Sequence, residues 1–173
     1  MQKLVWIVRF AGITACWVFI PAQILISVGH IIGRRLFSFS GTPLQELEWH
    51  LFVATIFFCF GLAYLADRHV RIDILRDRLR ASSRVRIEVV GFFIAILPFC
   101  LVTIYFGTEY AIDSFETGER SRAALGLPHR WIIKSVIPLG ALFLLVAGIV
   151  VVSRNIAILR GNSDADNPAE QRQ

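Results

Sequence analysis

The chain alternates between long apolar runs and short charged segments. Lysine, arginine, aspartate and glutamate are absent from residues 10–33, 49–66, 89–108 and 135–153, which are runs of 24, 18, 20 and 19 residues. A helix needs about 20 mainly apolar residues to cross the roughly 30 Å hydrocarbon core of a bilayer. The pattern therefore predicts an all-α integral membrane protein with four transmembrane helices, over residues 6–32, 47–66, 88–106 and 132–153.

The segment between the second and third spans fixes the predicted topology. Residues 67–88 hold seven arginines, and a charged residue at the centre of a membrane helix costs about 2.5–3.5 kcal/mol on the insertion scale. An excess of lysine and arginine marks the cytoplasmic side. If this segment and both termini are inside, twelve of the 18 lysines and arginines lie on the inner side and six on the outer side. Five of these six belong to the connections 33–46 and 107–131, and the sixth is Lys134. We therefore expect both termini in the cytoplasm.

The same arginine-rich segment is expected to contact the membrane surface. Ile72, Leu75 and Leu79 recur at helical spacing, which predicts a short amphipathic interfacial helix between the second and third spans. His69 and Asp73 are four residues apart and would share one face. The favoured interpretation is that His69 and Asp73 are an exposed pair near the headgroups, and the second is that they form a hydrogen bond to a partner subunit. The residues assigned to the lipid and cytoplasmic interface are Arg68, His69, Arg71, Asp73, Arg76, Arg78, Arg80, Arg84 and Arg86.

Prolines and polar residues predict bends and ends of the helices. Pro21, Pro98 and Pro138 fall inside the predicted spans and should kink them, because proline cannot donate the helical hydrogen bond. Thr42 is the predicted N-cap of the second helix, with Pro43 at its first position. Residues 161–173 are polar and lack aromatics, so we expect a disordered cytoplasmic tail after a membrane domain of residues 1–160.

An acidic stripe follows the third span. Glu109, Asp113 and Glu116 are spaced to lie on one helical face, and Arg120 and Arg122 come soon after. One interpretation is a solvated face with weak ion pairs, each worth about 0–1 kcal/mol. The other is an electrostatic docking patch for a soluble partner. The residue pattern by itself favours the solvated face.

No catalytic motif is present, so the chain is not expected to be an enzyme. It lacks a phosphate-binding loop, a nucleophile elbow and a zinc-binding helix motif. Cys16, Cys59 and Cys100 lie in the apolar runs without Cys-x-x-Cys spacing, and are interpreted as small packing residues and not as a disulfide or metal set. No cofactor or metal is therefore expected on this chain.

Three functional interpretations remain from the residues. The middles of the spans lack the ionisable residues that coupling sites of transporters usually contain, which favours a subunit that packs against a larger membrane protein. His30 and His50 are predicted near the outer surface on successive helices, where they would suit a haem- or quinone-binding anchor subunit of a respiratory enzyme. The third is a small membrane protein without a transport partner.

Two stretches resemble a known family. The run Tyr64-Leu-Ala-Asp-Arg-His-Val-Arg-Ile-Asp-Ile-Leu75 resembles the signature of the small, DctQ-type membrane subunit of TRAP (tripartite ATP-independent periplasmic) transporters. The second stretch is Glu119-Arg-Ser121, then Leu127-Pro128, Trp131 and Ile137-Pro-Leu-Gly140, which is similar to three short runs of that family in the same order. The resemblance covers about residues 46–159. One departure is the pair His129 and Arg130 between Pro128 and Trp131, where the family more often has one residue or none.

The resemblance implies a function that the residues do not show by themselves. Members of the family are small scaffold subunits in the bacterial inner membrane. Their partners are a large membrane subunit that carries substrate and sodium, and a periplasmic binding protein that delivers the substrate, often an organic acid. By this resemblance, sodium is expected on the large subunit, no substrate-binding residue is expected in this chain, and its other contacts are membrane lipids and not nucleic acid.

Overall fold

The computed structural model describes residues 2–37, 41–66, 81–123 and 126–165. Every regular element within these residues is a helix. The elements are α1 (Gln2–Phe37), α2 (Thr42–Leu65), α4 (Ala81–Gly91), the π-helix η1 (Phe92–Ile96), α5 (Leu97–Glu116) and α6 (Trp131–Ala165). Four helical stretches are long and apolar enough to cross a membrane: Gln2–Leu36, Thr42–Leu65, Val85–Glu116 and Trp131–Ala157. The predicted all-helical fold with four spans is confirmed. Helices form because a backbone in hydrocarbon must satisfy its own hydrogen bonds.

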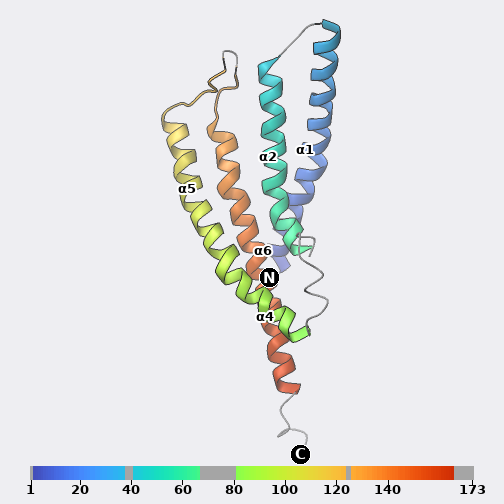
Figure 1. The fold of residues 1–173 in the computed structure, drawn as a ribbon, viewed down its shortest axis with the longest axis vertical. Coiled ribbons are helices and arrows are strands. Elements are labelled where there is room, and N and C mark those ends of the chain that lie inside the picture. The colour runs from blue at the N-terminus through green and yellow to red at the C-terminus, as the bar shows by residue number, and fades with distance from the viewer. Residues whose placement is uncertain (1, 38–40, 67–80, 124–125, 166–173) are drawn as a thin grey trace, which may run out of the picture.

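The four long helices lie side by side in an order that differs from the chain order. Figure 1 shows α5, α6, α2 and α1 in succession, and the helix contacts agree, since α6 packs against both α2 and α5. Successive long helices run in opposite directions, so α1 begins and α6 ends at the same end of the molecule (Figure 1). The arrangement resembles a plate one helix thick more than a closed bundle.

The helix α6 is the centre of this plate. In the most apolar window of each span, 39% of residues are buried in α6 but only 6% in α1. The buried cluster takes side chains from all four long helices: Val8, Tyr64, Cys100, Leu144 and Ala147. Large apolar side chains elsewhere are exposed, for example Trp17 at 78% and Leu25 at 73%. Such a surface is tolerated only against lipid or another membrane protein.

Glycines set the close approach of α2 and α6. A Cβ atom added at Gly140 would lie 2.6 Å from the Cβ of Phe57, and one at Gly61 would lie 2.8 Å from the backbone oxygen of Phe143. Because small residues let helix backbones approach closely in membranes, these two positions explain why α2 packs on α6 although 65 residues of chain lie between the end of α2 and the start of α6.

The helices are longer than the predicted spans. The 36 residues of α1 extend about 54 Å at 1.5 Å per residue. The third span begins within α4, which starts at Ala81 rather than near residue 88. The last helix does not end near Ser153 but continues past Gly161 to Ala165, so the first part of the predicted tail is helical. Residues 166–173 lie outside the described residues.

Most of the predicted interfacial segment also lies outside the described part of the chain. This holds for residues 67–80, and therefore for the assignments made to Arg68, His69, Arg71, Asp73, Arg76, Arg78 and Arg80. Arg84 and Arg86 belong to α4, where the side chain of Arg86 is exposed. Amphipathic character between the second and third spans stays a prediction.

The prolines occupy different helical contexts. Pro21 and Pro138 lie inside α1 and α6. Pro98 is the second residue after η1, and the amide of the intervening Leu97 donates to the oxygen of Phe92. A π-turn inserts an extra residue into the helical ladder, which accommodates a residue that cannot donate a hydrogen bond. The predicted N-cap at Thr42 is wrong by one residue. Gly41 is the N-cap, because its carbonyl accepts from the amides of Leu44 and Gln45 at 3.0 and 3.3 Å.

Candidate functional site

The connection between α5 and α6, residues 117–130, begins with a compact helix stop. Gly118 has a left-handed φ of 59°, its amide donates to the oxygen of Phe115 at 3.2 Å, and the amide of Glu119 donates to the oxygen of Ser114 at 3.0 Å. This pair of hydrogen bonds is a Schellman motif, which satisfies the last carbonyls of a helix and favours glycine at the left-handed position. The motif turns Glu119 back towards α6.

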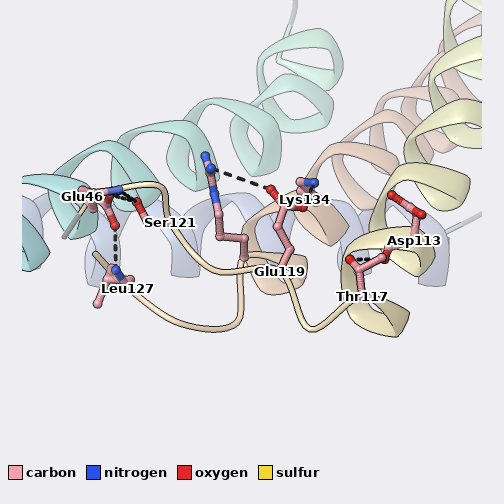
Figure 2. A network of polar contacts seen from close by, with 9 residues as sticks. Glu46, Asp113, Thr117, Glu119, Ser121, Leu127 and Lys134 are labelled. Atoms are coloured by element: carbon pink, nitrogen blue, oxygen red, sulfur yellow. Dashed lines mark hydrogen bonds and ion pairs between the residues drawn. The ribbon is translucent and has the colours of Figure 1, made fainter. Parts of the chain in front are cut away.

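An ion pair then joins Glu119 to the first turn of α6. Lys134 donates a hydrogen bond to Glu119 Oε2, and Arg130 Nη1 lies 3.7 Å from Glu119 Oε1 (Figure 2). The side chain of Lys134 is only 7% exposed, and its ammonium nitrogen lies 3.6 Å from the centroid of the Tyr110 ring on α5. The hydrogen bond from Lys134 is the main cause that holds the pKa of Glu119 below its usual range. A carboxylate and an aromatic face therefore hold this lysine between α5 and α6.

A second carboxylate ties the same connection to α2. Glu46 accepts hydrogen bonds from the Ser121 hydroxyl through Oε1 and from the Leu127 amide, at 2.7 Å, through Oε2 (Figure 2). Gly126 makes room for this contact, since a Cβ there would lie 2.9 Å from Glu46 Oε1 and would collide with the Ser121 side chain. The connection is thus fixed to α2 as well as to the two helices it links.

Backbone hydrogen bonds close the connection on itself. The amide of Ser121 donates to the oxygen of Leu127 at 3.2 Å, and the amide of Arg130 donates to the oxygen of Glu119 at 3.3 Å. His129 has a φ of 61°, in the left-handed region that histidine enters more readily than most residues. The additional residues noted between Pro128 and Trp131 are therefore accommodated by a left-handed turn just before α6.

Comparison with known families identifies the chain. A family model for the DctQ component of tripartite ATP-independent periplasmic transporters matches residues 23–157. The chain belongs to this family. The match extends from the middle of α1 into the second half of α6 and so includes part or all of every membrane span. A comparison with curated proteins finds no match. The DctQ family is a transporter component, so the chain is a small transporter subunit and not an enzyme.

The predicted docking residues of this DctQ-family subunit are all exposed. The stripe of Glu109, Asp113 and Glu116 lies on the last turns of α5, and Arg120 and Arg122 lie in the connection. Among the described residues, none of these five side chains takes part in an ion pair. The Thr117 hydroxyl donates a hydrogen bond to the backbone carbonyl of Asp113 at 2.7 Å (Figure 2), so this contact does not involve the Asp113 carboxylate.

The contacts that hold the connection were not predicted from the sequence. The sequence alone predicts no partner for Glu46. Lys134 enters the predicted topology only as an outer charge, because a lysine at the end of a span ordinarily extends to the membrane surface and gives no signal of a buried partner. Glu119 and Ser121 were noted only as part of the family resemblance. The structure brings these four residues together.

The histidines proposed for a cofactor have other surroundings. His30 Nδ1 lies 3.7 Å from Glu48 Oε2, near the other connection, which joins α1 to α2. His50 is partly buried on α2. Within the described residues, no group of three or more histidine, cysteine or acidic side chains is arranged to hold a metal ion. The family match gives no support to a haem- or quinone-binding anchor.

Proposed function

We propose that this DctQ-family subunit is a scaffold that braces the large membrane subunit of its transporter during sodium-coupled uptake of an organic acid. One observation carries the proposal. Aspartate, glutamate, lysine, arginine and histidine are absent from positions 10–29, 51–65, 89–108 and 135–153, all of which lie in described helices. Sites that couple ion and solute movement usually contain such residues or broken helix pairs. The substrate and sodium sites therefore belong to the large subunit.

The plate-like shape supports a bracing role. The described long helices form a single row in the order α5, α6, α2 and α1 (Figure 1), and the edge helices α1 and α5 expose large apolar side chains such as Trp17 and Phe106. The close glycine contacts of α2 with α6 favour a rigid unit. A rigid apolar plate offers a large area to a neighbouring membrane protein without moving itself.

The orientation in the bacterial inner membrane follows from the charges. We propose that both termini are cytoplasmic and that the two connections 38–41 and 117–130 face the periplasm. The alternating helix directions put the start of α1 and the end of α6 on one side (Figure 1), and twelve of the 18 lysines and arginines belong to that side in the predicted topology. A periplasmic binding protein would then meet the 117–130 connection and the acidic stripe of α5.

Reconstitution tests the scaffold function. We expect the chain to co-purify with a large membrane subunit, and we expect sodium-driven uptake in liposomes only when both membrane subunits and the binding protein are present. The chain reconstituted by itself should give no uptake. Uptake by the lone chain, or a chain that purifies without any membrane partner, would contradict the scaffold function and favour a membrane protein that acts independently.

Charge reversal tests the docking function separately. The triple variant Glu109→Lys, Asp113→Lys and Glu116→Lys should weaken binding-protein affinity at low salt, with a smaller difference at high salt because ions screen exposed charges. The control is Arg154→Glu, which reverses an exposed charge near the opposite end of α6. Unchanged affinity of the triple variant at low salt would remove the docking role and leave the solvated-face interpretation, while the scaffold function would stand.

A further inference from the structure

Two cysteines from different helices meet inside the membrane domain. Cys16 on α1 and Cys59 on α2 have their sulfur atoms 3.2 Å apart. Both are free thiols with partly buried side chains. The Cys59 thiol also lies 3.9 Å from the backbone oxygen of Gly12, one helical turn before Cys16. The sequence places these thiols 43 residues apart, so only the packing of α1 on α2 brings them together.

The pair lies where α1 depends on α2 for its position. As an edge helix, α1 packs mainly on α2 and has few contacts with α6. Close to the thiols, Gly12 packs against Leu62, and the rings of Phe19 and Phe58 are 6.0 Å apart. A covalent bond between the two sulfurs would therefore fix the edge helix to the rest of the plate at the crossing that already holds it.

We propose that Cys16 and Cys59 are an oxidisable pair, which a lipid-soluble organic hydroperoxide converts into a disulfide joining α1 to α2. One sulfur attacks the peroxide oxygen, the O–O bond breaks, and an alcohol and a sulfenic acid form. The second thiol then attacks the sulfenic sulfur, the S–S bond forms, and water leaves. In total two S–H bonds are lost, the two sulfurs together give up two electrons, and the hydroperoxide is reduced to alcohol and water.

The geometry favours a disulfide over further oxidation. A sulfenic acid is captured when a second thiol is within reach, and is otherwise open to irreversible oxidation. Here the partner sulfur is already in contact, and it needs to move by only about 1 Å to reach bonding distance. Because both thiols lie within the apolar spans, an oxidant that dissolves in the bilayer reaches them more readily than a water-soluble one.

The third cysteine provides an internal control. Cys100 on α5 is fully buried in the core cluster formed with α6, and the only sulfur–sulfur contact among the described residues joins Cys16 to Cys59. Cys100 should therefore stay reduced under conditions that oxidise Cys16 and Cys59.

The experiment treats the full-length protein in lipid nanodiscs with cumene hydroperoxide. Free thiols are then alkylated after denaturation, with and without prior reduction, and counted by mass spectrometry. We expect the wild-type protein to lose two alkylatable thiols, to recover them on reduction, and to yield a linked peptide pair containing Cys16 and Cys59. The matched controls are Cys16→Ser and Cys59→Ser, each of which keeps Cys100 and one thiol of the pair and should form no internal disulfide.

Two results would overturn the proposal. In the first, the wild-type protein keeps all three alkylatable thiols at a peroxide dose that oxidises the remaining thiol of the Cys16→Ser variant. The other is a disulfide that involves Cys100 or that links two protein molecules, since either would show that the contact between α1 and α2 does not direct the oxidation. Variants that misfold are recognised by comparing their thermal unfolding with that of the reduced wild type.

Discussion

The ammonium group of Lys134 donates a hydrogen bond to the carboxylate of Glu119, so an ion pair joins the first turn of α6 to the residue that follows the helix stop of α5. Lys134 is almost fully buried, and a buried charge is tolerated only when it is paired and hydrogen-bonded. This pair therefore explains how a lysine is accommodated at the start of an apolar span. It also fixes where the 117–130 connection leaves the plate.

Replacing this lysine should loosen the end of the α5–α6 pair. In Lys134→Met, the more distant Arg130 is the cation that remains near Glu119, and the cation over the Tyr110 ring is lost. We expect the unfolding temperature in nanodiscs to fall by a few degrees. Lys134→Arg keeps the charge and the stacking on Tyr110, so its unfolding temperature should fall less than that of Lys134→Met. Equal stability of Lys134→Met and wild type would show that the pair contributes nothing measurable.

The same pair predicts a dependence of stability on pH. The pKa of Glu119 is lowered in the folded state, mainly by the hydrogen bond from Lys134. Its contribution is therefore fully present above the unfolded-state pKa, near 4.5, and is lost as pH falls through the folded-state pKa. Wild type should be more stable than Glu119→Gln by a constant margin from pH 7 down to about pH 5, and the margin should shrink at lower pH. Unfolding curves of both proteins across this pH range measure the difference in stability. A difference that grows on acidification would contradict a lowered pKa of Glu119 in the folded state.

Detaching the connection from α2 should expose it to protease. Glu46→Gln keeps the size of the side chain but weakens its acceptance of hydrogen bonds from Ser121 and Leu127. Trypsin cleavage after Arg120 and Arg122, both exposed, should become several-fold faster because local opening is easier. Glu48→Gln is the control, since Glu48 faces His30 and not the connection. The same cleavage rate in both variants would show that Glu46 does not hold the connection.

Adding side-chain volume between α2 and α6 should destabilise the plate. Gly140→Leu forces atoms against Phe57, where even a Cβ would be too close, and overpacking of this kind costs about 1–3 kcal/mol. Gly29→Leu on α1 is the matched control, because nothing lies within 4 Å of a Cβ at that position. Unfolding free energies in the same lipid compare the two. A smaller loss for Gly140→Leu than for Gly29→Leu would contradict the close packing of α2 on α6.

The left-handed residue before α6 predicts an unusual ranking of substitutions. His129→Gly should leave stability unchanged or raise it by up to about 1 kcal/mol, because glycine adopts positive φ without a steric cost. His129→Val should lower stability, since a β-branched residue is strongly disfavoured there. Thermal unfolding of the two variants beside wild type checks the order. If valine were tolerated better than glycine, the turn described here would be wrong.

Much of the fold could be predicted from the sequence because membrane insertion depends on local composition. The uncharged runs located all four spans, and the family resemblance around Asp67 and Glu119 agreed with the family match. The ends of the helices were less predictable: charged residues such as Arg34 and Arg154 continue the helices beyond the apolar runs, since a helix need not stop where the hydrocarbon does. The candidate docking residues were predicted as exposed and are exposed, but no observation tests their role.

The sequence by itself determined that the chain crosses a membrane four times, since run length and charge decide whether a segment enters lipid. Only the tertiary structure decided that α6 lies between α2 and α5, that Glu46 holds a connection about 80 residues away, and that Cys16 touches Cys59. The physical reason is that hydrophobicity does not distinguish one helix neighbour from another inside a bilayer, where lipid is as apolar as protein. Helix order is set instead by close contacts at glycines and by a few paired polar groups, and these depend on residues far apart in the chain.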